Sequence, residues 1–186
     1  MLIPHKKLLY RKEEYLLSYW AKFSLTAPKI ESIQFDESVR SSAFLQLQRK
    51  LYICGGGPKP KEKPTFTHPL SSFYSMNYSG LCTSLASMSL NRSFLSLAGL
   101  PSTLIALGGN SHENIKTKAC EMYLTRSNKW NALPSLNIAR WWPGICLLVS
   151  RVVLCFCGKA NEVNKGNSVE KLALFKDREW EMIELG

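Results

Sequence analysis

The sequence predicts an all-β protein made of repeated four-stranded sheets, and three recurring landmarks support this prediction. The first is an apolar strand that ends in a glycine turn, as in LYICGG, TLIALGG and VVLCFCG. The second follows some twenty-five residues later, and the third is an arginine before a new apolar strand. All three recur with one period of about fifty residues, which is the length of a four-stranded repeat unit. The second landmark falls at Cys82, Trp130 and Trp180, and the third at Arg40, Arg92 and Arg140.

Individual strands are predicted where β-branched and bulky apolar residues cluster between Gly, Pro, Asn and Ser. In one repeat the strand signals are STLIALGG, KACEMYL, KWNAL and then GICLLVS. The apolar run from Gly144 to Gly158 is split by Arg151, so we expect two buried strands there and no membrane span. The strands expected with most support are Leu51 to Cys54, Leu104 to Leu107, Gly144 to Leu148 and Val152 to Phe156.

One stretch carries a more specific pattern. After LIALGG come Tyr123, then Trp130 seven residues later, then Leu133, Leu136 and Arg140. This spacing resembles the kelch-repeat family. The resemblance implies an all-β, kelch-type β-propeller segment of about three four-stranded blades.

The neighbouring repeats match this pattern less closely. The first has Tyr74 but carries Cys82 where the family places its Trp, and the third has Cys157 for the first glycine and Leu172 near the Tyr position. The repeated residues are expected to be structural, with aromatic side chains between blades and arginines bonded to buried carbonyls. The structural motif comprises Gly55, Gly56, Tyr74, Arg92, Gly108, Gly109, Tyr123, Trp130, Arg140, Gly158 and Trp180.

The repeats divide the chain into residues 40–91, 92–139 and 140–186, preceded by an N-terminal segment 1–39. That segment is interpreted as a partial blade or cap, with an amphipathic helix from Arg11 to Phe23 as the alternative. The loop from Gly55 to Pro69 is rich in Pro and Lys and is predicted to be solvated. Closed propellers typically use 4–8 blades, so we expect an open arc that self-associates to complete a propeller, or a fragment of a longer protein.

Cysteine usage favours a reducing, cytoplasmic compartment. Most of the six cysteines lie in apolar strand-like runs, where a thiol acts as a small hydrophobe. Cys155 and Cys157 are spaced to share one face of a strand, but no second pair at zinc spacing accompanies them. No metal or other cofactor is therefore predicted.

The remaining motifs give no support for catalysis. The glycines of GGGPKPKEK lack the GK[ST] ending of a phosphate loop, and neither a GxSxG elbow nor HExxH occurs. His5, His68 and His112 are scattered along the chain. We therefore expect no enzymatic activity.

The predicted function is a non-enzymatic scaffold that binds another protein through loops at the blade ends. Trp141 and Trp142 do not recur in the other repeats, and adjacent strand residues point to opposite faces, so one of them is a partner-binding candidate. The formal charge of +10 and the patch Lys59, Lys61 and Lys63 leave one alternative, a nucleic-acid or acidic-surface binder. No RNA-binding motif accompanies that patch, so nucleic acid is the less favoured partner.

Overall fold

The computed structural model describes residues 41–57, 69–112, 115–160 and 168–183 of the chain. The expectations for residues 1–39, Arg40 and the three lysines Lys59, Lys61 and Lys63 lie outside these described residues. The described part forms 14 strands and no α-helix, so the all-β prediction is confirmed. The strands form four antiparallel sheets and close no barrel in this part of the chain.

Three of the sheets have four strands each, and in each sheet the strands are arranged in the order in which they occur along the chain. Sheet 1 contains β1 (Ala43–Leu47), β2 (Lys50–Cys54), β3 (Phe73–Asn77) and β4 (Cys82–Leu85). Sheet 2 contains β5 (Ser96–Leu100), β6 (Thr103–Leu107), β7 (Cys120–Leu124) and β8 (Lys129–Leu133). Sheet 3 contains β10 (Gly144–Leu147), β11 (Val152–Phe156), β13 (Val169–Ala173) and β14 (Glu181–Ile183). A short fourth sheet pairs β9 (Arg140–Trp141) with β12 (Lys159–Ala160). The short strand β12 of this fourth sheet intervenes in sequence between β11 and β13 of sheet 3.

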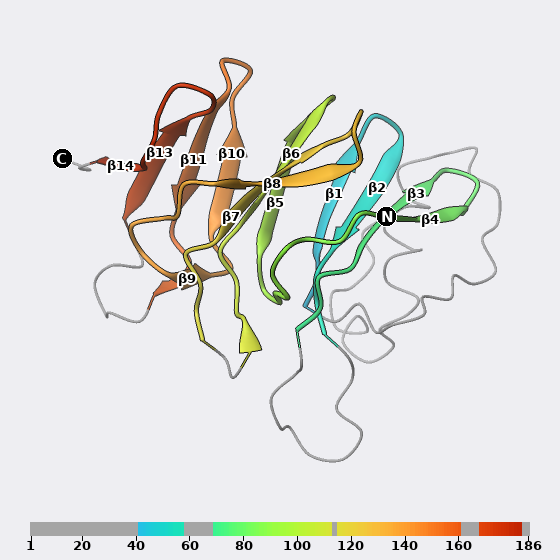
Figure 1. Cartoon of the computed structure of the whole chain (residues 1–186), viewed down its shortest axis with the longest axis horizontal. Coiled ribbons are helices and arrows are strands. Elements are labelled where there is room, and N and C mark those ends of the chain that lie inside the picture. Colours follow the sequence, from blue (N-terminus) through green and yellow to red (C-terminus); the bar gives the residue numbers. More distant parts are fainter. Residues whose placement is uncertain (1–40, 58–68, 113–114, 161–167, 184–186) are drawn as a thin grey trace, which may run out of the picture.

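Sheet 2 lies between sheets 1 and 3, and each of its faces is covered by one neighbour (Figure 1). Because side chains alternate along a strand, β6 and β7 send Leu104 and Tyr123 towards sheet 1 and Ile105 and Met122 towards sheet 3. The first strand β5 lies next to both β1 and β10. The described residues therefore form one apolar core in each space between successive sheets, and a smaller cluster of Leu51, Ile53 and Met76 lies on the other face of sheet 1.

The predicted strands agree with β2, β6, β10 and β11, but one grouping was wrong. GICLL was expected to complete the sheet formed by TLIALGG, KACEMYL and KWNAL. It forms β10 of sheet 3, where Ile145 pairs with Cys155 of β11. A tight turn, in which Leu148 N–H donates to the Val152 carbonyl and Arg151 N–H donates to the Leu148 carbonyl, folds the two halves of the apolar run back on each other. The first strand of sheet 2 is instead β5, SLAGL, whose apolar character is weaker.

The same apolar run was also expected to give two fully buried strands. In β11 only alternate residues are buried, namely Val153 and Cys155, and all of β10 is half-buried. One face of sheet 3 packs on sheet 2, and the described residues include no sheet over the other face. The solvated loop needs a similar correction at its ends, because Gly55 to Gly57 and Pro69 are buried.

The turns after β2, β6 and β11 share one backbone conformation. Their first residues Gly55, Gly108 and Cys157 have φ of 64°, 60° and 56°. The next residue has φ of 104° at Gly56 and 103° at Gly109. A Cβ on Gly109 would lie 2.6 Å from the Ser93 carbonyl oxygen, so the close approach of the connector before β5 to the turn after β6 requires glycine there. Cys157 fills a glycine position, as its alignment in the sequence predicts.

Strand register corrects one member of the predicted motif. Tyr123 pairs with Leu104, and the residue in the same position of sheet 1 is Met76, which pairs with Leu51. Tyr74 lies two residues earlier, at the position that Glu121 occupies in sheet 2. The expected Tyr of the first repeat is thus out of register, because the apolar alternation of FYSMN tolerates a shift of two residues without changing the face.

Candidate functional site

Each of the two spaces between sheets is closed by a buried ion pair. The connector from β4 to β5 (residues 86–95) carries Arg92, whose Nη2 donates to Glu121 of β7 at 2.8 Å. The connector from β8 to β10 (residues 134–143) carries Arg140, whose Nη2 donates to Glu170 of β13, also at 2.8 Å. Neither arginine side chain is exposed to solvent.

Both arginines also donate to backbone carbonyls, which is the structural role expected from the sequence. Arg92 Nη1 donates to Ala119 at 2.9 Å, and Arg140 Nη1 donates to Cys157 at 2.8 Å. The second carboxylate oxygen of each glutamate accepts a connector N–H, from Ser89 to Glu121 and from Asn137 to Glu170. Charged groups this deeply buried are stable only when paired and hydrogen-bonded.

The repeated tryptophans complete the same junctions. Trp130 is buried, as predicted, and its indole N–H donates to the Ala86 carbonyl at 2.8 Å. The indole N–H of Trp180 likewise donates to the Pro134 carbonyl at 2.9 Å. Trp130 lies in the fourth strand of sheet 2 and Trp180 directly before the fourth strand of sheet 3, so each indole links this part of its sheet to the connector that leaves the previous sheet. These residues serve packing, and they offer no surface to a ligand.

The aromatic residues that are candidates for binding a partner lie on the connectors from β4 to β5 and from β8 to β10. Phe94, Trp141 and Trp142, with Lys116 and Lys159 beside them, form a cluster that we call the aromatic patch. Phe94 lies 4.8 Å from Trp142 and 5.4 Å from Trp141 between ring centroids, in both cases edge to face. The two indoles stack at 5.7 Å. The sequence expectation that one of the adjacent tryptophans is less buried is confirmed, because Trp142 is 61% exposed and Trp141 is half-buried.

Backbone hydrogen bonds hold the patch in place across three sheets. Ser41, Phe94 and Trp142 occupy the same position before the first strand of sheets 1, 2 and 3, with φ of 57°, 55° and 49°. Phe94 N–H donates to Ser41 C=O at 2.8 Å, and Trp142 N–H donates to Phe94 C=O at 2.8 Å. A left-handed backbone is costly for bulky residues and persists only where the surroundings impose it. The backbone that carries Trp142 is therefore held in place by the fold.

Two lysines flank Trp141. Lys116 Nζ lies 5.6 Å and Lys159 Nζ 5.3 Å from the indole centroid, which is within cation–π range. Lys116 also donates to the Ala160 carbonyl of β12 at 3.1 Å. The Nε1 atom of Trp141 is buried and has no hydrogen-bond partner among the described residues. The short β9–β12 sheet, which sequence reasoning did not find, brings Lys159 to this patch.

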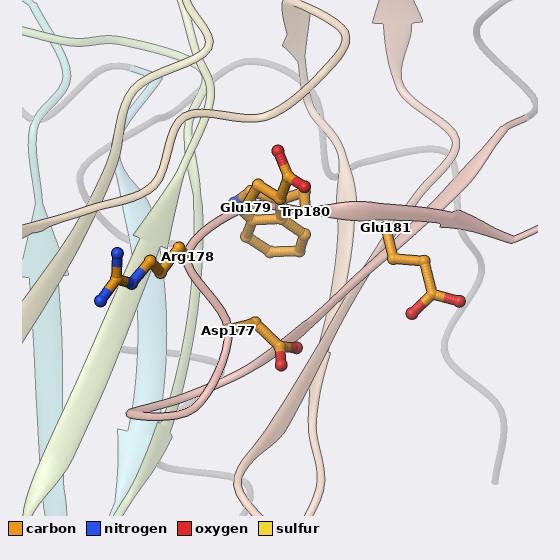
Figure 2. Close-up of a pocket in the computed structure, with 5 residues that line it drawn as sticks. All are labelled: Asp177, Arg178, Glu179, Trp180 and Glu181. Carbon is orange, nitrogen blue, oxygen red and sulfur yellow. The ribbon is translucent and has the colours of Figure 1, made fainter.

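An open pocket near the C-terminus does not form a site. It is lined by the consecutive residues 177–181 before and at the start of β14. Figure 2 shows that Arg178, Glu179 and Glu181 point in different directions and not towards a common centre. Asp177 accepts the N–H of Ala173 at 2.6 Å and so stabilises the turn after β13.

The cysteines form no metal site within the described residues, which contain no cluster of three or more His, Cys, Asp or Glu able to hold an ion. The suggestion that Cys155 and Cys157 share a face was wrong. Cys155 is buried in β11, whereas Cys157 follows the strand in a left-handed turn and is exposed. None of the six cysteines, all of which lie in the described ranges, forms a disulfide.

Comparison with known proteins gave no match to any family model and none to any curated protein. Within the described residues, the structure contains no helix with the length and apolar character needed to cross a bilayer.

Proposed function

We propose that this protein is a non-enzymatic scaffold of kelch-type propeller repeats that binds a partner protein through the aromatic patch. The observation that carries the proposal is Trp142, which is 61% exposed and held in a left-handed backbone by its hydrogen bond to Phe94. A large aromatic side chain kept rigid at the surface loses little conformational entropy on binding, and such residues dominate protein interfaces.

Three features support the propeller interpretation. Each four-stranded sheet is an antiparallel meander, the first strands β1, β5 and β10 lie side by side, and the glycine turns repeat their backbone angles. The connectors carry the aromatic patch at the ends of the sheets, which corresponds to the loop surface expected to contact a partner. The six thiols remain reduced in the cytoplasm, where we locate this function.

Affinity capture from the native source tests the proposal. Immobilised wild-type protein is compared with Trp142→Ala and with a matched control, Leu81→Ala, which removes another exposed apolar side chain from the turn between β3 and β4. A partner that is retained by wild-type protein and by Leu81→Ala but lost by Trp142→Ala supports the proposal. A partner retained equally by all three does not use the patch.

A second candidate function is binding of single-stranded nucleic acid, which Lys116 and Lys159 favour because they flank Trp141. Bases stack on exposed aromatic rings, and lysines neutralise phosphates. Binding of this kind weakens steeply with added salt. A titration of generic RNA at increasing salt, with Lys159→Gln as the variant, separates the two functions: salt-sensitive binding reduced by this substitution favours nucleic acid.

A further inference from the structure

One face of sheet 3 is apolar and is not covered by another sheet in the described part of the chain. The residues on it follow from the alternation of β10, β11, β13 and β14, because Val153, Cys155 and Leu172 point to sheet 2. Their neighbours in sequence point the other way. We call the result the outer face of sheet 3; it comprises Cys146, Val152, Leu154, Phe156, Val169, Lys171, Ala173, Glu181 and Ile183.

The corresponding faces of sheets 1 and 2 are core. Leu154 and Phe156 of sheet 3 occupy the positions of Ile105 and Leu107 in sheet 2, both of which are fully buried beneath sheet 3. In sheet 1 the same positions are held by Tyr52 and Cys54, which are buried beneath sheet 2. Phe156, by contrast, is 36% exposed. The outer face thus continues a series of packing surfaces but lacks its covering sheet.

The details of the outer face are those of a packing surface. Phe156 pairs with Gly144 across the sheet, and its ring lies over Gly144 in space that a Cβ would occupy. The only charges on the face belong to Lys171 and Glu181, which pair at 2.9 Å. The face is therefore electrically neutral although the chain carries a formal charge of +10. Two such faces can meet without repulsion between like charges.

Sheet 1 does not offer a complementary open surface at the other end of the stack. On its face turned away from sheet 2, Leu51, Ile53 and Met76 are 5%, 1% and 1% exposed. A head-to-tail contact between sheet 3 of one chain and sheet 1 of another would need this face to be open. Among the described sheet faces only the outer face of sheet 3 is open, so a sheet-to-sheet contact between two copies uses this face twice and gives a closed two-fold dimer.

We propose that the outer face of sheet 3 binds the outer face of sheet 3 of a second copy of this chain. Two sheets packed face to face bury apolar side chains that water otherwise contacts, as in β-sandwiches. The outer face of sheet 3 and the aromatic patch share no residue. The contact also differs from the completion of a propeller ring, in which sheet 3 would meet sheet 1.

Mass measurement of the full chain in solution tests the dimer. Light scattering after size-exclusion chromatography should give twice the 21.0 kDa chain mass at high protein concentration. Leu154→Glu should give the single-chain mass, because it introduces a charge into the centre of the contact. The control Leu81→Glu makes the same change at an exposed site of sheet 1 and should remain dimeric. A monomeric wild type, a dimeric Leu154→Glu variant or larger open assemblies would overturn the proposal.

Thiol labelling of the wild-type protein provides a readout that needs no substitution. Cys146 lies on the outer face, whereas Cys157 lies beyond the end of β11 and is exposed. Alkylation of Cys146 by iodoacetamide should slow as protein concentration rises, and alkylation of Cys157 should not change. Equal behaviour of the two thiols across the concentration range would contradict burial of the face between two copies.

Discussion

The Arg140 guanidinium donates a 2.8 Å hydrogen bond to the Glu170 carboxylate, and neither side chain is exposed to solvent. The pair joins the connector leaving sheet 2 to the third strand of sheet 3. Arg92 and Glu121 repeat it between sheets 1 and 2. Because these groups are almost fully buried, each charge depends on its partner, and the stacking of the sheets depends on both.

Removing one member of a pair should therefore be far more damaging than removing both. Glu170→Ala leaves Arg140 as a buried charge without its carboxylate and should lower the unfolding free energy by about 3–5 kcal/mol. The double substitution Arg140→Met with Glu170→Leu should cost less than Glu170→Ala alone. Urea unfolding measures all three. As a control, Glu179→Ala removes an exposed carboxylate from the turn before β14 and should change stability by about 0.5 kcal/mol or less.

The two kinds of tryptophan should respond in opposite ways to truncation. Trp130→Ala removes a buried ring and its hydrogen bond to Ala86, so it should cost about 3–5 kcal/mol in unfolding free energy. Trp142→Ala removes an exposed ring and should change stability by about 0.5 kcal/mol or less. Thermal or urea unfolding of both variants measures the contrast. Equal losses would mean that Trp142 is part of the core.

The glycine turns offer a test of backbone geometry. Gly109→Ala places a Cβ 2.6 Å from the Ser93 carbonyl oxygen in a left-handed backbone, so it should destabilise by at least ~1–2 kcal/mol. Cys157→Gly relaxes a left-handed residue that has a side chain, at φ of 56°, and should leave stability within about 1 kcal/mol of wild type. Loss of stability in Cys157→Gly comparable to that in Gly109→Ala would show that the Cys157 side chain contributes more to stability than its left-handed backbone costs.

Because burial raises the pKa values of three thiols, the unfolding free energy should fall at alkaline pH. Desolvation by burial raises the pKa of Cys54, Cys120 and Cys155 to about 12, from their usual 9.0. The unfolded chain loses these protons above its lower pKa while the folded chain retains them. The contribution of these thiols to the unfolding free energy is therefore fully present below pH 9.0, and it is lost as the pH rises from 9.0 towards about 12. Urea unfolding as a function of pH measures this decline, and Cys155→Ala should make it shallower.

Much of the fold could be predicted because its signals are local or periodic. Apolar strands followed by glycine turns recur at a fixed spacing, and even Cys157 could be aligned with Gly55 and Gly108 before its left-handed backbone was known. The register of Tyr74 could not be predicted, since a shift of two residues preserves the alternation of apolar side chains. The sequence also could not show whether GICLL belongs to sheet 2 or to sheet 3. Only the tertiary structure, in which β10 pairs with β11, assigns it to sheet 3.

The candidate site was only partly predictable for a similar reason. Trp141 and Trp142 stood out because they do not recur, but the contribution of Phe94 depends on a hydrogen bond between connectors far apart in sequence. Glu121 and Glu170 were missed because a charge within an apolar strand has no sequence signal of its own. Their spacing, which follows the same period as Arg92 and Arg140, is the signal that could have found them.

Binding of a partner protein through the aromatic patch is the central claim. The most direct test is the dissociation constant of the captured partner, measured by calorimetry with wild-type protein, Trp142→Ala and Leu81→Ala. Loss of a central aromatic contact typically costs about 2 kcal/mol or more, so Trp142→Ala should weaken binding at least about tenfold while Leu81→Ala binds as wild type. Equal affinity of all three proteins for the partner would contradict the account.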